Sequence, residues 1–185
     1  TWPLAAHFFS AIPYTLMPIA GYEQVPLMPG DHLQAFYWYW LLSDNLFGSS
    51  AFLTNPYEFN GPHGPMSTVY AFFPYSLVYL LFLPLGPLGA YNGLILFSFL
   101  SCGLSMFLLA RTWTDDHWAS LLAGLAFAVL PYRVSHIAGG QLTGHIIFFL
   151  PLALFFVEKT LLTGRWAFGI ASGACLVIVS WMDPH

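Results

Sequence analysis

Long apolar stretches set the limits on what this chain can fold into. Four of them fill its second half, at about 90–110, 115–132, 142–158 and 166–181. A helix that crosses the hydrocarbon core of a bilayer needs roughly 20 mainly apolar residues, and these stretches come close to that length. Only 6% of the residues are charged, against about 25% in soluble proteins. The sequence therefore predicts an all-α, polytopic transmembrane helical bundle, with residues 1–185 forming a single transmembrane domain.

The opening segment, residues 1–20, is apolar enough to supply most of a fifth spanning helix. Pro13 and Pro18 would kink or end this helix, because proline lacks a backbone donor and clashes with the preceding turn. The chain starts inside an apolar run and stops at Asp183-Pro184-His185. We therefore expect about five spanning helices and expect both ends of the chain to be incomplete.

The interval from Gly21 to Ser67 is the longest one without a spanning-length apolar run, and it contains no Lys or Arg. Its stretch 33–47 is rich in Trp and Tyr, whose amphipathic rings settle at the level of the lipid headgroups. We expect this stretch to form a helix along the bilayer surface, within a large first loop. The loop also holds half of the acidic residues of the chain: Glu23, Asp31, Asp44 and Glu58.

Segment 68–88 is apolar but interrupted by three prolines, so the basic residues must decide whether it crosses. Counting crossings back from the far end places Arg111, Lys159 and Arg165 on one face and Arg133 alone on the other. By the positive-inside rule the three-residue face is cytoplasmic. If segment 68–88 crossed once, the large loop would be cytoplasmic without a single basic residue. We therefore expect an interfacial or re-entrant segment, which its broken helix also favours, and an outward-facing loop.

Polar residues gather on this predicted outer face. An ionisable residue at membrane depth costs some 2.5 to 3.5 kcal/mol and is by default a functional candidate. We predict that the catalytic residues are Asp31, Arg133 and His136. We predict that substrate is contacted by His32, Tyr37, His63, His145, Asp183 and His185. On the opposite face, Asp115-Asp116 is expected only to cap the helix that starts there.

Arg133 carries a planar guanidinium that suits the oxygens of a phosphate. The alternative is a structural arginine whose side chain snorkels to the interface. His136 and His145 lie nine residues apart, which is too loose for a helical metal pair. Both are therefore weak candidates as metal ligands or as a proton donor, and we name no residue as a metal ligand. Cys102 and Cys175 lie in apolar runs and receive no redox role.

Several short motifs together resemble a known family. The first is Pro-Gly-Asp31-His-Leu-Gln-Ala-Phe-Tyr-Trp-Tyr-Trp, followed by Asn55-Pro-Tyr and Gly61-Pro. Later come Ala90-Tyr-Asn-Gly, Leu-Ala-Gly-Leu-Ala-Phe-Ala, Pro131-Tyr-Arg-Val-Ser-His136 and Leu150-Pro-Leu. This pattern, over about 21–185, resembles the first outer loop and following helices of bacterial polytopic membrane glycosyltransferases of the GT-C superfamily. By this resemblance the chain is expected to be the N-terminal part of a longer membrane protein.

The resemblance implies an enzyme of the bacterial cytoplasmic (inner) membrane that moves a sugar from a polyprenyl-phosphate donor to an acceptor on the outer face. In that superfamily an early acidic residue of the first outer loop is the catalytic base or a metal ligand, and by position this is Asp31. Some members double this acidic residue, whereas His32 follows here, so a divalent metal at Asp31 stays open as a cofactor. In this scheme Asp31 takes the proton of the acceptor, while Arg133, with His136, stabilises the departing phosphate.

Two other classes compete with this hypothesis. The chain could be a non-catalytic accessory subunit that packs against larger partners in a membrane complex, because its aromatic faces would serve that role equally well. A transporter would need polar residues in the middle of its helices, and the helices at 90–110 and 166–181 offer only serines. The expected partners are therefore a lipid-linked sugar donor and membrane lipids. Nucleic acid is excluded, since four basic residues make no phosphate-binding surface.

Overall fold

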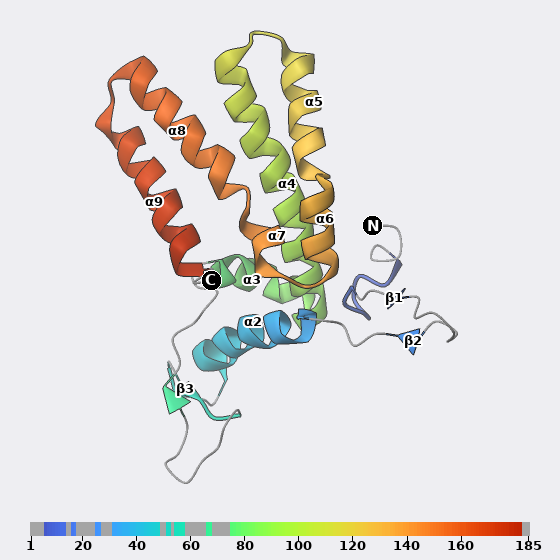
Figure 1. Cartoon of the computed structure of the whole chain (residues 1–185). Helices are drawn as coiled ribbons and strands as arrows, with labels where there is room; N and C mark the ends of the chain where they lie inside the picture. The colour runs from blue at the N-terminus through green and yellow to red at the C-terminus, as the bar shows by residue number, and fades with distance from the viewer. Residues whose placement is uncertain are drawn as a thin grey trace.

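The computed structural model describes residues 6–13, 16–17, 25–26, 31–48, 51–52, 54–57, 66–67 and 75–182. Most of this described part is helical, and a long central helix packs against most of the others (Figure 1). The helices are α2 (His32–Phe47), α3 (Ser76–Phe82), the short 3-10 helix η1 (Leu83–Leu85), α4 (Pro87–Trp113), α5 (His117–Ala128), α6 (Pro131–Ala138), α7 (Leu142–Ile146), α8 (Phe149–Thr163) and α9 (Trp166–Met182). This arrangement confirms the predicted helical fold class.

Two helical hairpins form the upright part of the molecule, α4 with α5 and α8 with α9, and α4 also packs against α8 (Figure 1). Small residues let α4 and α5 approach closely. A Cβ atom on Gly124 would lie 2.6 Å from the backbone oxygen of Gly103. Because any side chain at position 124 would push the two backbones apart, this glycine sets the separation of the first hairpin.

Within the described part, three helical segments are long and apolar enough to cross a membrane: Pro87–Trp113, His117–Ala138 and Gly144–Thr163. They support a membrane protein. Helix α9, at 17 residues, and the segment Ser76–Leu85 are apolar but shorter. The second candidate span consists of α5 and α6 with a break at Leu130, whose backbone is pushed out of the helical region by the proline that follows. The predicted number of five spans is therefore not reached.

The expected spanning helix at 1–20 is wrong for the residues that the structure describes there. Residues 6–10 form a single turn, in which the His7 carbonyl accepts from Ser10 and Ala11. Strand β1 (Leu16–Met17) follows and pairs antiparallel with β2 (Val25–Pro26). Pro13 cannot extend a helix.

A contact with α4 is a second reason why the N-terminal segment does not form a spanning helix. The buried Asn92 side chain donates to the carbonyls of Phe8 and Ala11, each at 2.7 Å. These two carbonyls are thus bonded to another helix instead of to a turn of their own, which favours the irregular path of the segment. A second short antiparallel pair, β3 (Thr54–Asn55) with β4 (Met66–Ser67), lies beyond α2.

The two ends of the bundle differ in content. The α4–α5 and α8–α9 turns lie at one end, whereas α2, α3 and the α6–α7 turn lie at the other (Figure 1). Trp113 Nε1 donates to Glu158 Oε1 at 3.1 Å and joins the two hairpins at the first end. The predicted grouping of Arg111, Lys159 and Arg165 at one end is therefore confirmed.

Two further predictions from the sequence, the Asp116 cap and the helix at 33–47, agree with the structure. The Asp116 side chain accepts from the backbone N–H groups of Trp118 and Ala119, as predicted for an N-cap. Helix α2 covers the predicted stretch 33–47. Helices α2 and α3 and the start of α4 lie at the same end (Figure 1), so the described residues 75–88 do not carry the chain to the opposite end; the interfacial or re-entrant position of segment 68–88 stays a prediction.

Candidate functional site

Asp31 is the residue just before α2, and its side chain is exposed. Its carboxylate makes no capping hydrogen bond to the helix that it precedes. The backbone holds the residue instead: the Asp31 N–H donates to the carbonyl of Gly139, at the end of α6, over 3.1 Å. The start of α2 is thereby fixed beside the α6–α7 turn, with the Asp31 side chain directed away from the core.

His32 is buried directly beneath Asp31 and bonds two other helices. Its Nε2 lies 3.1 Å from the carbonyl oxygen of Ala138, and its Nδ1 lies 2.8 Å from the hydroxyl of Tyr91. A carbonyl can only accept, so Nε2 carries the hydrogen and Nδ1 accepts from Tyr91. Burial lowers the pKa of His32 from its usual 6.5, although the Ala138 carbonyl and the charge of Asp31 act in the opposite direction. His32 is therefore neutral at pH 7.

A glycine makes this contact possible. Gly140 has a positive φ of 77°, and a Cβ atom there would lie 2.2 Å from the backbone nitrogen of His32. No side chain fits at such a distance, and L-residues rarely adopt this backbone region. The Gly139-Gly140 turn is thus shaped so that the first turn of α2 can lie against it.

Arg133 is fully buried inside the bundle. Its guanidinium donates to the Ala128 carbonyl and, over 2.7 Å, to the Ser98 hydroxyl, and its central carbon lies 3.9 Å from the centre of the Phe99 ring. Its Nε has no hydrogen-bond partner in the described part of the chain. No carboxylate among the described residues forms an ion pair with it, so the acceptors that hold this cation are neutral.

The two other histidines of the predicted site differ in exposure. His136 is half-buried in the last turn of α6, with its ring centre 4.1 Å from that of Tyr132. His145 is 1% exposed, and neither ring nitrogen has a hydrogen-bond partner among the described residues. Its ring centre lies 6.5 Å from those of both Tyr75 and Tyr91. His145 therefore lies in the interior, enclosed by aromatic rings.

The remaining predicted residues are scattered. Tyr37 donates to Asn55 Oδ1 at 2.6 Å and so joins α2 to β3. His63, Asp183 and His185 lie outside the described residues. Among the residues described, no three His, Cys, Asp or Glu side chains gather in a way that would hold a metal ion.

Asp31 and Arg133 are not brought into contact. The Asp31 backbone touches Gly139, which lies six residues beyond Arg133, or about 9 Å along a helix axis. The guanidinium turns toward α4, where Ser98 and Phe99 enclose it. The two predicted catalytic groups therefore occupy different surroundings, one exposed and one buried.

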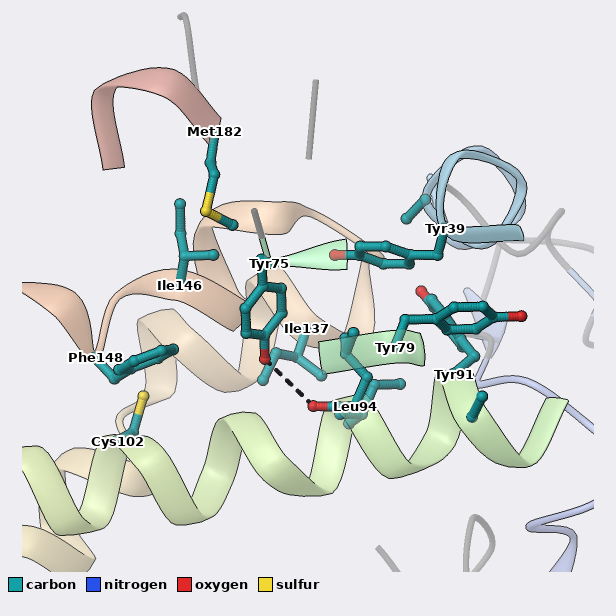
Figure 2. Close-up of a cluster of buried hydrophobic side chains, with 13 residues drawn as sticks. Tyr39, Tyr75, Tyr79, Tyr91, Leu94, Cys102, Ile137, Ile146, Phe148 and Met182 are labelled. Carbon is teal, nitrogen blue, oxygen red and sulfur yellow. Dashed lines mark hydrogen bonds between the residues drawn. The ribbon is translucent and has the colours of Figure 1, made fainter. Parts of the chain in front are cut away.

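A cluster of buried tyrosines joins α2, α3 and α4, and the sequence did not single it out. Tyr39 of α2 stacks on Tyr79 of α3 with ring centres 5.8 Å apart, and Tyr75 donates to the Leu94 carbonyl at 3.4 Å (Figure 2). Burial raises the pKa of Tyr79 to about 12 and raises those of Tyr39 and Tyr75 as well. These phenols therefore stay neutral. Tyr75, at the N-cap of α3, and Tyr79, within it, are four residues apart. This spacing was the signal available in the sequence, since such a pair shares one helix face.

Fold and site together define a helical membrane protein with a buried polar interior beneath an aromatic helix. Comparison with protein families, with characterised proteins and with solved structures finds no match for this chain.

Proposed function

We propose that this chain is the membrane-embedded part of a glycosyltransferase that moves a sugar from a polyprenyl-phosphate donor to an acceptor on the outer side of a bacterial inner membrane. The observation that supports it most is the placement of Asp31. This exposed carboxylate is held by its backbone at the end of the bundle opposite Arg111, Lys159 and Arg165. By the positive-inside rule that end faces outward, where lipid-linked sugars would be used.

Asp31 acts as the base in this proposal. Its carboxylate takes the proton of an acceptor hydroxyl as the hydroxyl oxygen bonds to the anomeric carbon of the sugar. The bond between that carbon and the lipid phosphate breaks, and the phosphate leaves with the bonding electrons. A positioned base contributes about 10² to 10⁴ in rate. In this proposal His136, half-buried in the last turn of α6, supports the negative charge of the leaving group.

The role of Arg133 in this proposal differs from the role that the sequence predicted. Its charge would favour a departing phosphate, but in this structure the guanidinium is enclosed and bonded to Ser98 and Ala128. We therefore assign catalysis at the surface to Asp31 and His136. Arg133 takes part only in a more open arrangement of the same end.

The test is an Asp31→Asn substitution in the protein in lipid membranes, supplied with a panel of polyprenyl-phosphate sugars. Mass spectrometry follows the loss of sugar from the carrier. We expect transfer to fall by about 10² or more, because an amide cannot take the proton. The matched control is Asp44→Asn, which changes a second carboxylate of α2, hydrogen-bonded by Tyr57 at 2.9 Å. Full transfer by the Asp31 variant would remove this residue from the mechanism.

A second candidate is a non-catalytic subunit of a larger membrane complex. The internal bonding of Arg133 favours it, because a guanidinium committed to Ser98 and Ala128 stabilises the fold without any substrate. Transfer that is absent from the wild-type protein with every donor, but restored when a co-purified partner is added, would support this class.

A further inference from the structure

Several buried polar groups of the bundle interior have no hydrogen-bond partner among the described residues. Both ring nitrogens of His145, the Nε of Arg133 and the hydroxyl of Ser76 are buried and have no hydrogen-bond partner in the described part of the chain. Burying such groups unpaired is costly, because their hydration is lost and nothing replaces it. When several unpaired donors gather in one interior, a ligand or water with accepting oxygens is expected to use them in some state of the protein.

Helix α2 covers this interior. His145 lies beside the rings of Tyr75 and Tyr91. From α2, Tyr39 contacts both of these rings, and His32 contacts Tyr91. The ring centres of Tyr39 and Tyr91 are 6.1 Å apart, and Figure 2 shows Tyr39 reaching from α2 toward Tyr75, Tyr79 and Tyr91. Removing the first half of α2 would uncover Tyr91 and, behind it, His145.

The attachment of α2 differs along its length. Its first turn is held by discrete polar contacts: Asp31 to Gly139, His32 to Ala138 and His32 to Tyr91. Its second half combines a polar contact with apolar packing: Asn45 donates to the Thr54 carbonyl, and Leu41 and Leu42 are buried against Leu80 of α3. Polar contacts of this kind break singly, whereas apolar packing tolerates small rotations. The first turn is therefore the end that can detach, and the packing on α3 is the pivot.

We propose that α2 is a lid over His145, latched at its first turn by Gly140 and His32, and that the structure is its closed state. Opening the latch brings the unpaired ring nitrogens of His145 within reach of a ligand that carries accepting oxygens. The nature of that ligand rests on the proposed function, as the lid lies beside Asp31. The existence of the lid does not rest on the proposed function, because it can be tested without any sugar transfer.

The test measures the reactivity of His145 toward diethyl pyrocarbonate, which modifies unprotonated imidazole nitrogens, in the protein in lipid membranes. Peptide mass spectrometry compares His145 with His117, an exposed histidine at the opposite end. In the wild-type protein we expect His117 to react and His145 to be protected. In Gly140→Ala, which forces a methyl group against His32, we expect His145 to react at least about tenfold faster with His117 unchanged, as the open population rises.

Two other glycines provide controls. Gly139→Ala adds the same methyl group where the nearest atom is the Ser135 oxygen at 3.6 Å. Gly164→Ala repeats the backbone strain, with a φ of 66°, where nothing lies within 4 Å. Both control variants should keep His145 protected.

Tyr91→Phe removes one latch bond without adding an atom. It is the second test variant, used if Gly140→Ala does not fold. It should raise the reactivity of His145 while the circular dichroism spectrum stays unchanged.

The proposal fails if His145 stays protected in a folded Gly140→Ala and in Tyr91→Phe. It also fails if Gly139→Ala or Gly164→Ala exposes His145 as much as Gly140→Ala does, because the effect would then be general loosening. Loss of transfer in Asp31→Asn with an intact labelling pattern would support the lid and the transferase separately. A normal labelling series in a protein that transfers no sugar would overturn the proposed function and leave the lid standing.

Discussion

The two ends of the bundle organise their polar groups in different ways. At the end with the α4–α5 and α8–α9 turns, the charged end, Arg111 donates to the carbonyls of Thr114 and Asp115, three and four residues away in sequence. The bond there from Trp113 to Glu158 spans 45 residues, but it is exposed. At the other end, the aromatic end with α2, α3 and the α6–α7 turn, His32 bonds to Tyr91 and to Ala138, which are 59 and 106 residues away in sequence. Local bonds are what any hairpin turn requires. Long-range bonds between buried groups place particular side chains at particular points.

The difference indicates where function is to be sought. The charged groups of the first end are exposed and solvated, so the fold bears little cost for them. At the second end, His32, Arg133 and His145 are buried, and their burial has to be compensated by partners. Substitutions at the two ends should therefore differ in their effect on stability, and this expectation can be measured.

The largest effect is expected at Asn92, at the aromatic end. Asn92→Ala removes both donors to the Phe8 and Ala11 carbonyls and should lower the free energy of unfolding by about 2 to 3 kcal/mol, because two acceptors lose their bonds. Denaturant titration in detergent micelles, followed by circular dichroism, measures it. An unchanged midpoint would mean that water satisfies these carbonyls and that this end is no more tightly specified than the other.

A pH dependence should come from His32. Burial lowers its pKa in the folded state, so the unfolded chain binds the proton more tightly. Stability is then full above the ordinary pKa of 6.5 and falls as the pH drops below it. Between pH 7 and pH 5 the loss attributable to His32 is at most about 2 kcal/mol.

His32→Gln is the matched variant for this measurement, since its difference from the wild-type protein removes the contribution of the other histidines. The groups around His32 are Asp31, Tyr91 and the Ala138 carbonyl, with His145 behind Tyr91. Parallel pH profiles of the two proteins would contradict the expectation.

The smallest effect is expected at the charged end. Glu158→Gln weakens the hydrogen bond from Trp113 at an exposed position and should change the free energy of unfolding by no more than about 0.5 kcal/mol, because exposed charged contacts contribute little. The same denaturant titration tests it. A loss as large as that of Asn92→Ala would abolish the contrast between the two ends.

The sequence predicted the helices better than the site. Apolar length and the Asp116 cap located α4, α5 and α9 closely, because these features are local. The N-terminal segment was mistaken for a helix, because its composition is apolar and nothing local shows that Asn92, more than 80 residues away, bonds its carbonyls. Hydrogen bonds over such distances cannot be read from spacing.

The candidate site shows the same limit. Asp31 was placed at the mouth of the bundle because a loop rich in carboxylates and free of basic residues carries it, and that placement depends on charge alone. The surroundings of Arg133 could not be predicted, since Ser98 and Phe99 come from another helix and resemble many other apolar-run residues. The contact of Gly140 with His32 could not be predicted either, because it depends on how α2 packs against the α6–α7 turn.

The partners of Arg133 also bear on how the chain enters the bilayer. A helix that carried this charge alone would meet a penalty of some 2.5 to 3.5 kcal/mol at membrane depth. Ser98 and Phe99, which relieve it, belong to α4, the preceding candidate span. The segment with Arg133 therefore inserts most favourably when α4 is already beside it, so the first hairpin should leave the translocation machinery as a pair and not one helix at a time.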